Sequence, residues 1–124
     1  MKFLKTVLVA EDMDINFMLI EELLIDMDIN VIHVMNGEEA VEACRTNPDI
    51  DLVLMDIRMP IMDGHTATKL IKGFLPNLPI IAQSACSLEE QKTESDEIYD
   101  DYIVKPIYKD DLTQKVMKYI NEEI

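Results

Sequence analysis

The chain repeats one pattern five times: a short apolar run, rich in Val and Ile, is followed by a longer stretch with helical periodicity. The apolar runs cover residues 6–12, 30–35, 52–57, 79–84 and 101–106, and the helical stretches cover 14–27, 37–46, 64–73, 87–98 and 108–122. Turn-forming pairs such as Asn36-Gly37 and Asn47-Pro48 lie between them. Because the runs are continuously apolar rather than alternating, the pattern predicts one parallel sheet with helices on both faces.

Length and charge narrow the class of protein. With 124 residues, of which 48% are hydrophobic, residues 1–124 are expected to form one α/β domain with its own core. No stretch approaches the ~20 apolar residues of a membrane span, and the N-terminal apolar run ends in acidic residues rather than in a cleavage site, so we expect a cytoplasmic protein. Cys44 and Cys86 are expected to be reduced packing residues. The net charge of −14 argues against direct contact with nucleic acid, whose phosphates it would repel.

Acidic residues stand at the ends of two apolar runs. Glu11 and Asp12 close the first run, and Asp56 comes near the end of the third. Since parallel strands present their carboxyl ends at one edge of a sheet, the three carboxylates should meet there and repel one another. A hard cation such as Mg²⁺, which prefers oxygen ligands, would relieve that repulsion. The alternative is helix capping by Asp12 or Asp14, but capping explains neither Glu11 nor Asp56.

Two further side chains reach the same predicted edge. Ser84 ends the fourth run and Lys105 lies near the end of the fifth. Taken singly, a serine there is usually a helix cap, although Ser87 fits the capping-box pattern better, and a lysine before proline is usually a turn residue. Taken with three carboxylates, a hydroxyl and an ammonium indicate a site for phosphoryl transfer, with a carboxylate as the nucleophile.

Four motifs together resemble the receiver domains of two-component response regulators. They are ED at 11–12, MDIRMPIMDG at 55–64, SA at 84–85 and YIVKP at 102–106, in that order and with matching spacing. The segments EDMDIN and MPIMDG further resemble receivers attached to hybrid sensor histidine kinases. The resemblance implies a flavodoxin-like fold with five helices and a five-stranded parallel sheet in the order 2-1-3-4-5. It also implies a signalling module that catalyses its own aspartyl phosphorylation and dephosphorylation.

The resemblance assigns roles to the acidic residues and their neighbours. It makes Asp56 the phospho-acceptor, and it makes Glu11 and Asp12 ligands of Mg²⁺, together with Asp56 and the backbone carbonyl of Arg58. The phosphoryl group would come from the phosphohistidine of a histidine kinase or phosphotransfer domain. An attached kinase or output domain outside this chain is a further expected partner.

The same resemblance implies a switch. It makes Ser84 the switch hydroxyl, Lys105 the phosphate-pairing lysine and Tyr102 the switch aromatic, and it implies a cis peptide bond before Pro106. Phosphorylation would change the surface formed by residues 87–98, 101–106 and 108–122, through which the domain could also form a homodimer. We interpret Tyr99 as an ordinary rim aromatic, and His33 and His65 as packing and surface residues.

The first helical stretch carries more apolar residues than its core-facing side requires. At 100° per residue, one side is formed by Phe17, Ile20, Leu23, Leu24 and Met27, and the opposite side carries Ile15, Met18, Leu19 and Ile25. This second group is either a set of scattered surface hydrophobics or a docking patch for another helix. With the receiver resemblance, we predict that Ile15, Asn16 and Leu19 contact the kinase or phosphotransfer partner.

Two other functions compete with the receiver interpretation. A Mg²⁺-dependent phosphatase with an aspartyl nucleophile would commonly need a second aspartate two residues after Asp56, where Arg58 stands. A binding-only pseudo-receiver would not need the complete set of acidic, hydroxyl and ammonium groups. The sequence therefore favours a working phospho-acceptor.

Overall fold

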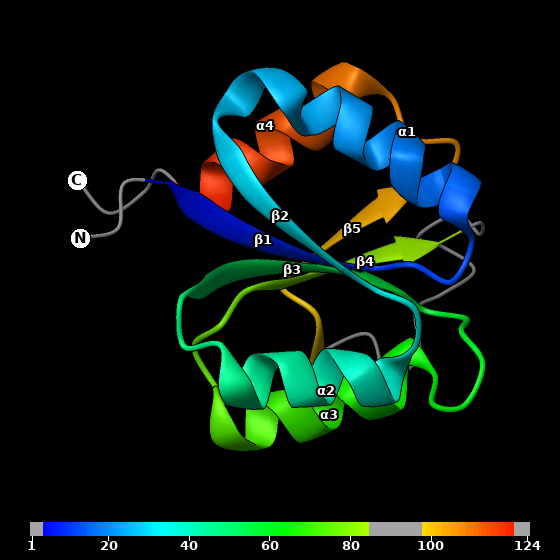
Figure 1. Ribbon diagram of the computed structural model, residues 1–124, viewed down its shortest axis with the longest axis vertical. Coiled ribbons are helices and arrows are strands. Elements are labelled where there is room, and N and C mark those ends of the chain that lie inside the picture. Colours follow the sequence, from blue (N-terminus) through cyan, green and yellow to red (C-terminus); the bar gives the residue numbers. More distant parts are fainter. Residues whose placement is uncertain (1–3, 85–97, 121–124) are drawn as a thin grey trace.

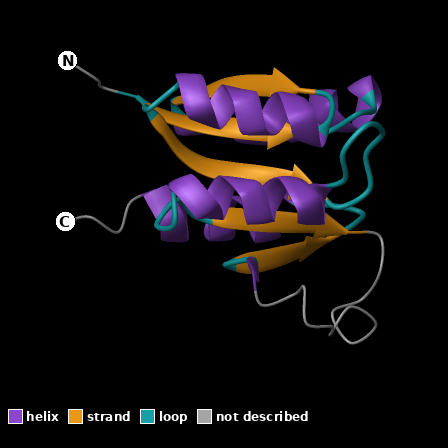
Figure 2. Cartoon of the chain, turned by 90° about the horizontal axis from the view of Figure 1, so that it is seen from below, coloured by secondary structure: helices purple, strands orange, loops and turns teal. Residues whose placement is uncertain are grey.

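The computed structural model describes residues 4–84 and 98–120, and its centre is one sheet of five parallel strands (Figure 1). The strands are β1 (Lys5–Ala10), β2 (Ile29–Val34), β3 (Ile50–Asp56), β4 (Ile80–Ser84) and β5 (Asp101–Val104). They lie in the order β2-β1-β3-β4-β5, and Figure 2 shows all arrowheads pointing the same way. The predicted parallel sheet and its strand order are confirmed.

Helices cover both faces of this sheet. They are α1 (Asp14–Leu24), α2 (Gly37–Thr46), α3 (Gly64–Phe74) and α4 (Lys109–Ile120), with a short 3-10 turn, η1 (Ile25–Met27), after α1. In Figure 1, α1 and α4 lie on one face and α2 and α3 on the other. The helix expected at 87–98 falls, except for its last residue, outside the described residues, as do Cys86 and Ser87. The helix expected at 108–122 is α4.

Two hydrophobic clusters fill the spaces between sheet and helices. Alternate strand residues enter alternate clusters: Leu8 and Ala10 pack with α2 and α3, whereas Val7 and Val9 pack with α1 and α4. Because both faces of the central strands are buried, these strands carry continuous apolar runs, such as residues 7–10 and 52–55, rather than apolar residues at every second position. Cys44 lies in the α2–α3 cluster, where burial raises the pKa of its thiol to about 11, as expected for a packing residue.

The N-termini of the helices show which side chains act as helix caps. The Asn36 side chain accepts a hydrogen bond of 2.8 Å from the Glu39 backbone N–H at the start of α2, and Asp63 accepts one of 2.8 Å from Thr66 at the start of α3. In α1 the N-cap position is Met13, and no side chain caps it. The alternative that Asp12 or Asp14 caps the first helix is therefore wrong.

The first helix is shorter than its sequence pattern predicts. Regular α-helix ends at Leu24, and residues 25–27 form a 3-10 turn before Asp28 takes a left-handed conformation with φ of 54°. Aspartate tolerates this region better than most residues, and the conformation lets the chain turn directly into β2 at Ile29. No helix in the described part of the chain is long and apolar enough to cross a membrane.

The two glycines of α3 should respond oppositely to substitution by alanine. A Cβ atom at Gly64 would overlap the backbone carbonyl oxygen of Asp56 and lie 2.9 Å from the Cα of Ile57, whereas a Cβ atom at Gly73 would meet nothing within 4 Å. We expect Gly73→Ala to raise the free energy of unfolding by about 0.5–1 kcal/mol, because alanine loses less backbone entropy in a helix. Gly64→Ala should lower it, because the backbone of Asp56 must shift. Urea unfolding of both variants measures the two signs, and equal effects would contradict this packing.

Candidate functional site

Three carboxylates converge at the carboxyl ends of β1 and β3. Asp56 is the last residue of β3, and the register pairs Met55 with Ala10, so Glu11 follows β1 directly beside it. Glu11 and Asp56 are buried, and Asp12 is half-buried. Each of the three residues places one carboxylate oxygen within 4.8 Å of the other two. The sheet edge predicted from the sequence therefore carries the predicted acidic cluster.

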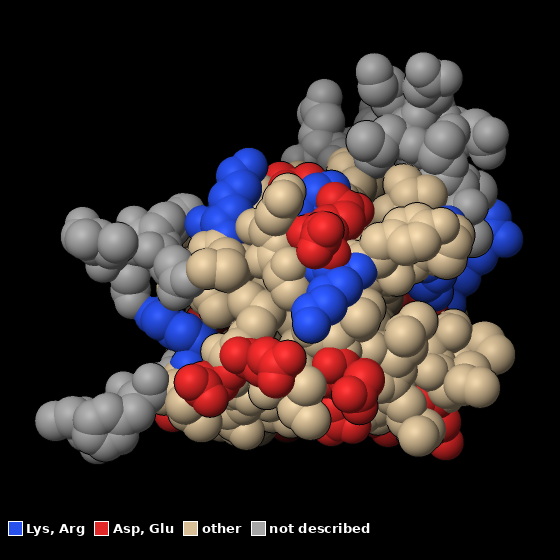
Figure 3. Space-filling model, turned by 90° about the horizontal axis from the view of Figure 1, so that it is seen from above, with Lys and Arg blue, Asp and Glu red and all other residues tan. Residues whose placement is uncertain are grey.

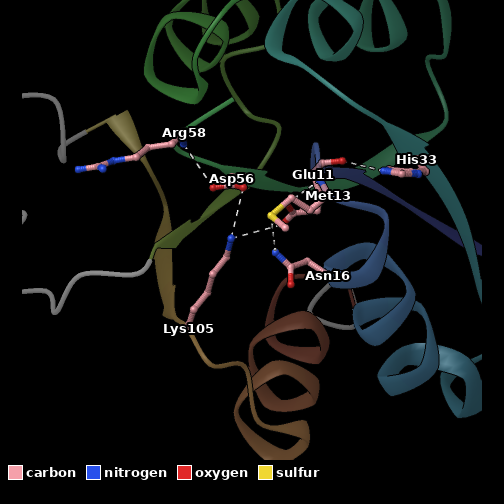
Figure 4. Close-up of polar contacts among 7 residues, drawn as sticks. All are labelled: Glu11, Met13, Asn16, His33, Asp56, Arg58 and Lys105. Carbon is pink, nitrogen blue, oxygen red and sulfur yellow. Dashed lines mark hydrogen bonds and ion pairs between the residues drawn. The ribbon is translucent and has the colours of Figure 1, made fainter. Parts of the chain in front are cut away.

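One ammonium group lies between the two buried acids. The Nζ atom of Lys105 is 3.3 Å from Glu11 Oε1 and 3.3 Å from Asp56 Oδ2 (Figure 4). Lys105 follows β5, and its backbone N–H donates a hydrogen bond of 2.7 Å to the carbonyl oxygen of Ser84 at the end of β4. The peptide bond between Lys105 and Pro106 is cis. The lysine thus brings one positive charge to two buried negative ones.

Backbone N–H groups hold the other oxygens of the same two carboxylates. Met13 donates to Glu11 Oε2 at 3.2 Å, and Arg58 donates to Asp56 Oδ1 at 3.3 Å. In Figure 4 the Arg58 side chain points away from the carboxylates, so its guanidinium does not neutralise them. Lys105 is therefore the cation that the described residues bring into contact with both buried acids.

The surroundings of Glu11 disfavour its negative charge. Burial raises the pKa of this carboxyl above its usual value of 4.5, and the nearby negative charge of Asp56 raises it further. Lys105 and the N–H of Met13 oppose the shift without cancelling it. A buried carboxylate with an elevated pKa beside a second carboxylate gains more from a bound cation than an exposed one does.

The backbone around Glu11 is held by a histidine on β2. The Nε2 atom of His33 is 2.8 Å from the carbonyl oxygen of Glu11, and because a carbonyl can only accept, Nε2 donates the hydrogen. The His33 ring stacks on Phe17 with ring centres 3.7 Å apart and planes 2° from parallel. His33 therefore packs between β2 and α1, as interpreted from the sequence, and also fixes the end of β1 that carries Glu11.

The arrangement of oxygen atoms suits a small divalent cation. Two oxygens bound to the same Mg²⁺ at about 2.1 Å each can be at most about 4.2 Å apart. The three carboxylates at this edge, with 4.8 Å as the largest separation, need only small side-chain movements to reach that spacing. Carboxylates are also the ligand type that Mg²⁺ prefers, so both the donors and their spacing fit this metal.

The two proposed switch residues lie on the neighbouring strands β4 and β5. Ser84 is buried at the end of β4, and the register pairs Gln83 with Asp56, so Ser84 stands one residue beyond the level of that carboxylate. Tyr102 of β5 is half-buried against the cluster formed with α2 and α3, on the sheet face opposite α1 and α4. In the register, Tyr102 pairs with Ala82 of the neighbouring strand β4, and the alanine side chain is small enough to leave room beside the tyrosine ring.

One connection was missed by the sequence interpretation. Tyr99 is buried rather than at the rim, its hydroxyl lies 2.9 Å from Nδ1 of His65, and its ring meets Tyr102 edge to face with centres 5.6 Å apart. The contact joins the start of α3 to a residue two positions before β5, and the two residues are 34 positions apart in the chain. Neither residue has a local sequence signal that points to the other, so only the packing reveals their contact.

The apolar side of α1 is exposed to solvent. Ile15, Met18 and Leu19 are 72%, 63% and 47% exposed, whereas Ile20 and Leu24 on the other side are buried. The division of the helix into two apolar sides is therefore confirmed. Asn16 lies between them and directs its side-chain amide at Met13 Sδ, 3.7 Å away, close to the acidic cluster (Figure 4).

Neutralising Glu11 should stabilise the metal-free protein. Because its pKa is higher in the folded chain than in the unfolded one, stability conferred by its proton is complete below about 4.5 and is lost as pH rises through the folded pKa. Glu11→Gln mimics the protonated form, so the variant should unfold at a higher temperature than the wild type at neutral pH. The difference should shrink as the pH is lowered toward 4.5.

Thermal unfolding of both proteins across this pH range, in a chelator, tests that expectation. Adding Mg²⁺ should stabilise the wild type more than Glu11→Gln. A difference in unfolding temperature that does not change with pH would contradict the elevated pKa.

Comparisons with known proteins give a consistent result. The family model described as "Response regulator receiver domain" matches residues 7–117. The chain is 39% identical over 119 residues to the sensor histidine kinase GacS of Pseudomonas protegens and 38% identical over 122 residues to the histidine-protein kinase BarA of Escherichia coli. These alignments cover 91% and 95% of this chain, but the chain spans only 13% of the length of either kinase.

Solved structures agree with the sequence comparison. The receiver domain of a sensor histidine kinase from Pseudomonas aeruginosa, with a magnesium ion coordinated in its active-site cleft, has a TM-score of 0.88 and 28% identity, covering 97% of this chain and all of that one. A co-crystal structure of the Saccharomyces cerevisiae phosphotransfer protein Ypd1 with the receiver domain of Ssk1 gives a TM-score of 0.85 at 25% identity, covering 94% of this chain and 88% of that one.

Proposed function

Because this chain belongs to the response regulator receiver domain family, we propose that Asp56 accepts a phosphoryl group from a phosphohistidine of a histidine kinase or phosphotransfer domain. The observation that carries the proposal is the contact of one ammonium, on Lys105, with both Glu11 and Asp56 inside a cluster of three carboxylates. A cluster that served only to end the strands would not need two buried acids facing each other. The repulsion between these buried acids destabilises the fold, and that cost is explained if phosphoryl transfer requires the acids.

The chemistry follows from the position of the Asp56 carboxylate. One of its oxygens attacks the phosphorus, the bond between phosphorus and the donor's imidazole nitrogen breaks, and the imidazole leaves, taking a proton from solvent. The N–H of Arg58 and the ammonium of Lys105 orient the two oxygens of the nucleophile before the attack. Once the phosphoryl group is attached, Lys105 is the side chain placed to pair with its oxygens.

A bound magnesium ion would complete the charge balance of the site. We assign its ligands to Glu11, Asp12 and Asp56, with the backbone carbonyl of Arg58 as the fourth, and the bound ion would neutralise the phosphoryl oxygens. The spacing of the three carboxylates supports this assignment, and so does the magnesium ion in the similar receiver domain from Pseudomonas aeruginosa.

Phosphorylation would be read out through β5 and α4. The new charge of about −1.5 to −2 on Asp56 attracts the Ser84 hydroxyl, which vacates space into which Tyr102 turns. The Tyr102 backbone is tied to α4, because the Lys115 ammonium donates to the carbonyl oxygen of Tyr102 and lies 3.6 Å from Asp101 Oδ1. A movement of Tyr102 therefore strains a contact that joins the strand to the helix. The same surface is where a homodimer would form.

The exposed apolar side of α1 is the proposed docking site for the phosphoryl donor. Ile15, Asn16 and Leu19 lie on the helix that begins four residues after β1, so a partner seated on them faces the acidic cluster. Figure 3 views the face covered by α1 and α4, where a row of acidic side chains runs along one edge and both acidic and basic side chains interrupt the uncharged surface. The helix α1 itself carries exposed acidic residues, Asp14, Glu21 and Glu22, beside its exposed apolar ones. Such a surface favours a partner that carries basic residues beside an apolar helix face. The complex of a yeast receiver with its phosphotransfer protein shows that this class of partner binds a similar domain.

The two competing functions are less well supported. For an aspartyl phosphatase, the residue two positions after the nucleophile would be an acid, whereas here it is Arg58, whose side chain points away from Asp56 (Figure 4). A binding-only domain would have no use for a lysine held between two buried acids.

Phosphorylation at Asp56 can be tested without knowing the natural donor. Incubation with Mg²⁺ and phosphoramidate should add the mass of one phosphoryl group, because the site supplies the nucleophile and the charge balance while the donor supplies only the group. Asp56→Asn should gain no mass, and chelation of Mg²⁺ should abolish the gain in the wild type. Mass gain in Asp56→Asn equal to that of the wild type would disprove the assignment of Asp56.

Docking on α1 predicts a donor-dependent defect. Leu19→Ala should slow phosphotransfer from a phosphorylated phosphotransfer domain by about tenfold, since truncating an anchor at an interface typically costs about 1–2 kcal/mol. Its phosphorylation by phosphoramidate should not change. Leu70→Ala is a matched control, because Leu70 on α3 is also 47% exposed but lies on the other face. Equal slowing with both donors would contradict docking at Leu19.

A further inference from the structure

The side chain of Gln83 lies in the core and has no hydrogen-bond partner among the described residues. Gln83 of β4 is completely buried, and within the part of the chain that the structure describes neither its amide nitrogen nor its amide oxygen makes a hydrogen bond. Such a group loses its hydration on folding and gains nothing in return. Buried polar groups are almost always paired, so an unpaired one calls for a reason, and a role in catalysis is one of the recognised reasons.

The sheet places Gln83 between the nucleophile and its lysine. In the register, Gln83 pairs with Asp56 on one side and with Ile103 on the other, and paired residues of parallel strands point to the same face. Lys105 is two residues after Ile103, so it leaves β5 on that face as well. Because β4 lies between β3 and β5, the side chain of Lys105 must cross β4 to reach Asp56, at or just beyond the level of Gln83.

Packing alone would be served better by an apolar residue at this position. The neighbouring residues on the same face of the three strands are Leu54, Ile81 and Ile103, and all three are completely buried. An apolar side chain of similar size would extend that cluster without a desolvation penalty. The amide group therefore has to be explained by the polar site at the end of the strands, which is where the next residues on this face lie.

One of the three N–H bonds of the Lys105 ammonium has no acceptor among the described residues. An ammonium carries three N–H bonds, and in the described residues the Nζ atom of Lys105 contacts two acceptors, Glu11 Oε1 and Asp56 Oδ2, each at 3.3 Å. Both contacts are long for charge-assisted hydrogen bonds, which are usually about 2.7–2.9 Å. The ammonium is thus loosely held before the phosphoryl group arrives. A neutral acceptor beneath it could limit its position without adding a fourth negative charge.

We propose that Gln83 is a positioning residue for Lys105: its amide oxygen accepts the third ammonium hydrogen when Lys105 pairs with the phosphoryl group. Lys105 then keeps its place over β4 while its other contacts change from carboxylate to phosphoryl oxygens. Gln83 itself touches neither the donor nor the phosphorus. This inference rests on the proposed phosphorylation of Asp56. It adds a residue that would position Lys105 for that reaction.

The variant Gln83→Met tests the proposal, since methionine has a similar length and shape but no amide. We expect its thermal stability to equal or exceed that of the wild type, and its Mg²⁺ affinity to stay within about twofold, because the carboxylates are untouched. Its affinity for beryllofluoride, a phosphoryl mimic, and its rate of phosphorylation by phosphoramidate should each fall about tenfold, as expected for loss of a hydrogen bond to a charged group.

Thr68→Val is the matched control. The Thr68 hydroxyl is also completely buried and without a partner among the described residues, but it belongs to α3, on the opposite face of the sheet. This variant should remove a buried unpaired group and leave beryllofluoride affinity unchanged. If Gln83→Met behaves like Thr68→Val, with the wild-type affinity and rate, the amide has no role at the site and the proposal fails.

A double-mutant cycle shows whether Gln83 acts through the lysine. If it does, Gln83→Met should have no additional effect on beryllofluoride affinity in a Lys105→Gln background. An equal loss in both backgrounds would overturn the proposal, and so would a matching loss of Mg²⁺ affinity in the single variant. Wild-type protein in the same assays separates the two hypotheses: if it is not phosphorylated, the proposed function fails, and if it is phosphorylated as fast as Gln83→Met, only the role of Gln83 fails.

Discussion

Three carboxylates that share a space less than 5 Å across repel one another, and this repulsion determines how the rest of the site must be built. One ammonium, from Lys105, relieves part of it by contacting both buried acids. The remainder shows in Glu11, whose pKa stays above its usual value despite the lysine. A site with surplus negative charge at a sheet edge binds a cation, and the cation with the lysine can then receive a phosphoryl group. In this sense the repulsion among the three carboxylates is the source of the chemistry proposed for the site.

Parallel topology brings these groups together from distant parts of the chain. Glu11 follows β1, Asp56 ends β3, Ser84 ends β4 and Lys105 follows β5, so four of the five parallel strands each deliver one piece to the same edge. The order of the strands also decides what lies between the pieces. Because β4 separates the nucleophile from the lysine, the residue on β4 that faces them is placed to affect both, and that residue is Gln83.

On each face of the sheet, a group of ring contacts lies close to the strand ends that carry the site. On the side of α1, His33 stacks on Phe17 and donates to the carbonyl of Glu11. On the side of α3, Tyr99 bonds to His65 and packs against Tyr102. The acidic cluster is therefore flanked by one contact that holds β1 still and one that ends at the ring expected to move. In the proposed switch, such an arrangement would let a change in charge at Asp56 act on β5 while the end of β1 keeps its position.

The sequence by itself determined the parallel sheet and the edge where the acids gather, because apolar runs, breakers and strand-end residues are local signals that survive without tertiary context. The order of the strands followed only from the resemblance to receiver domains. The exposed apolar side of α1 was likewise readable from its period of 3.6 residues. Only the tertiary structure decided that neither Asp12 nor Asp14 caps α1, that Tyr99 is buried and contacts His65, and that the amide of Gln83 has no hydrogen-bond partner among the described residues. Each of these depends on which side chains meet across strands or between distant segments, and no local pattern of residues encodes such a meeting.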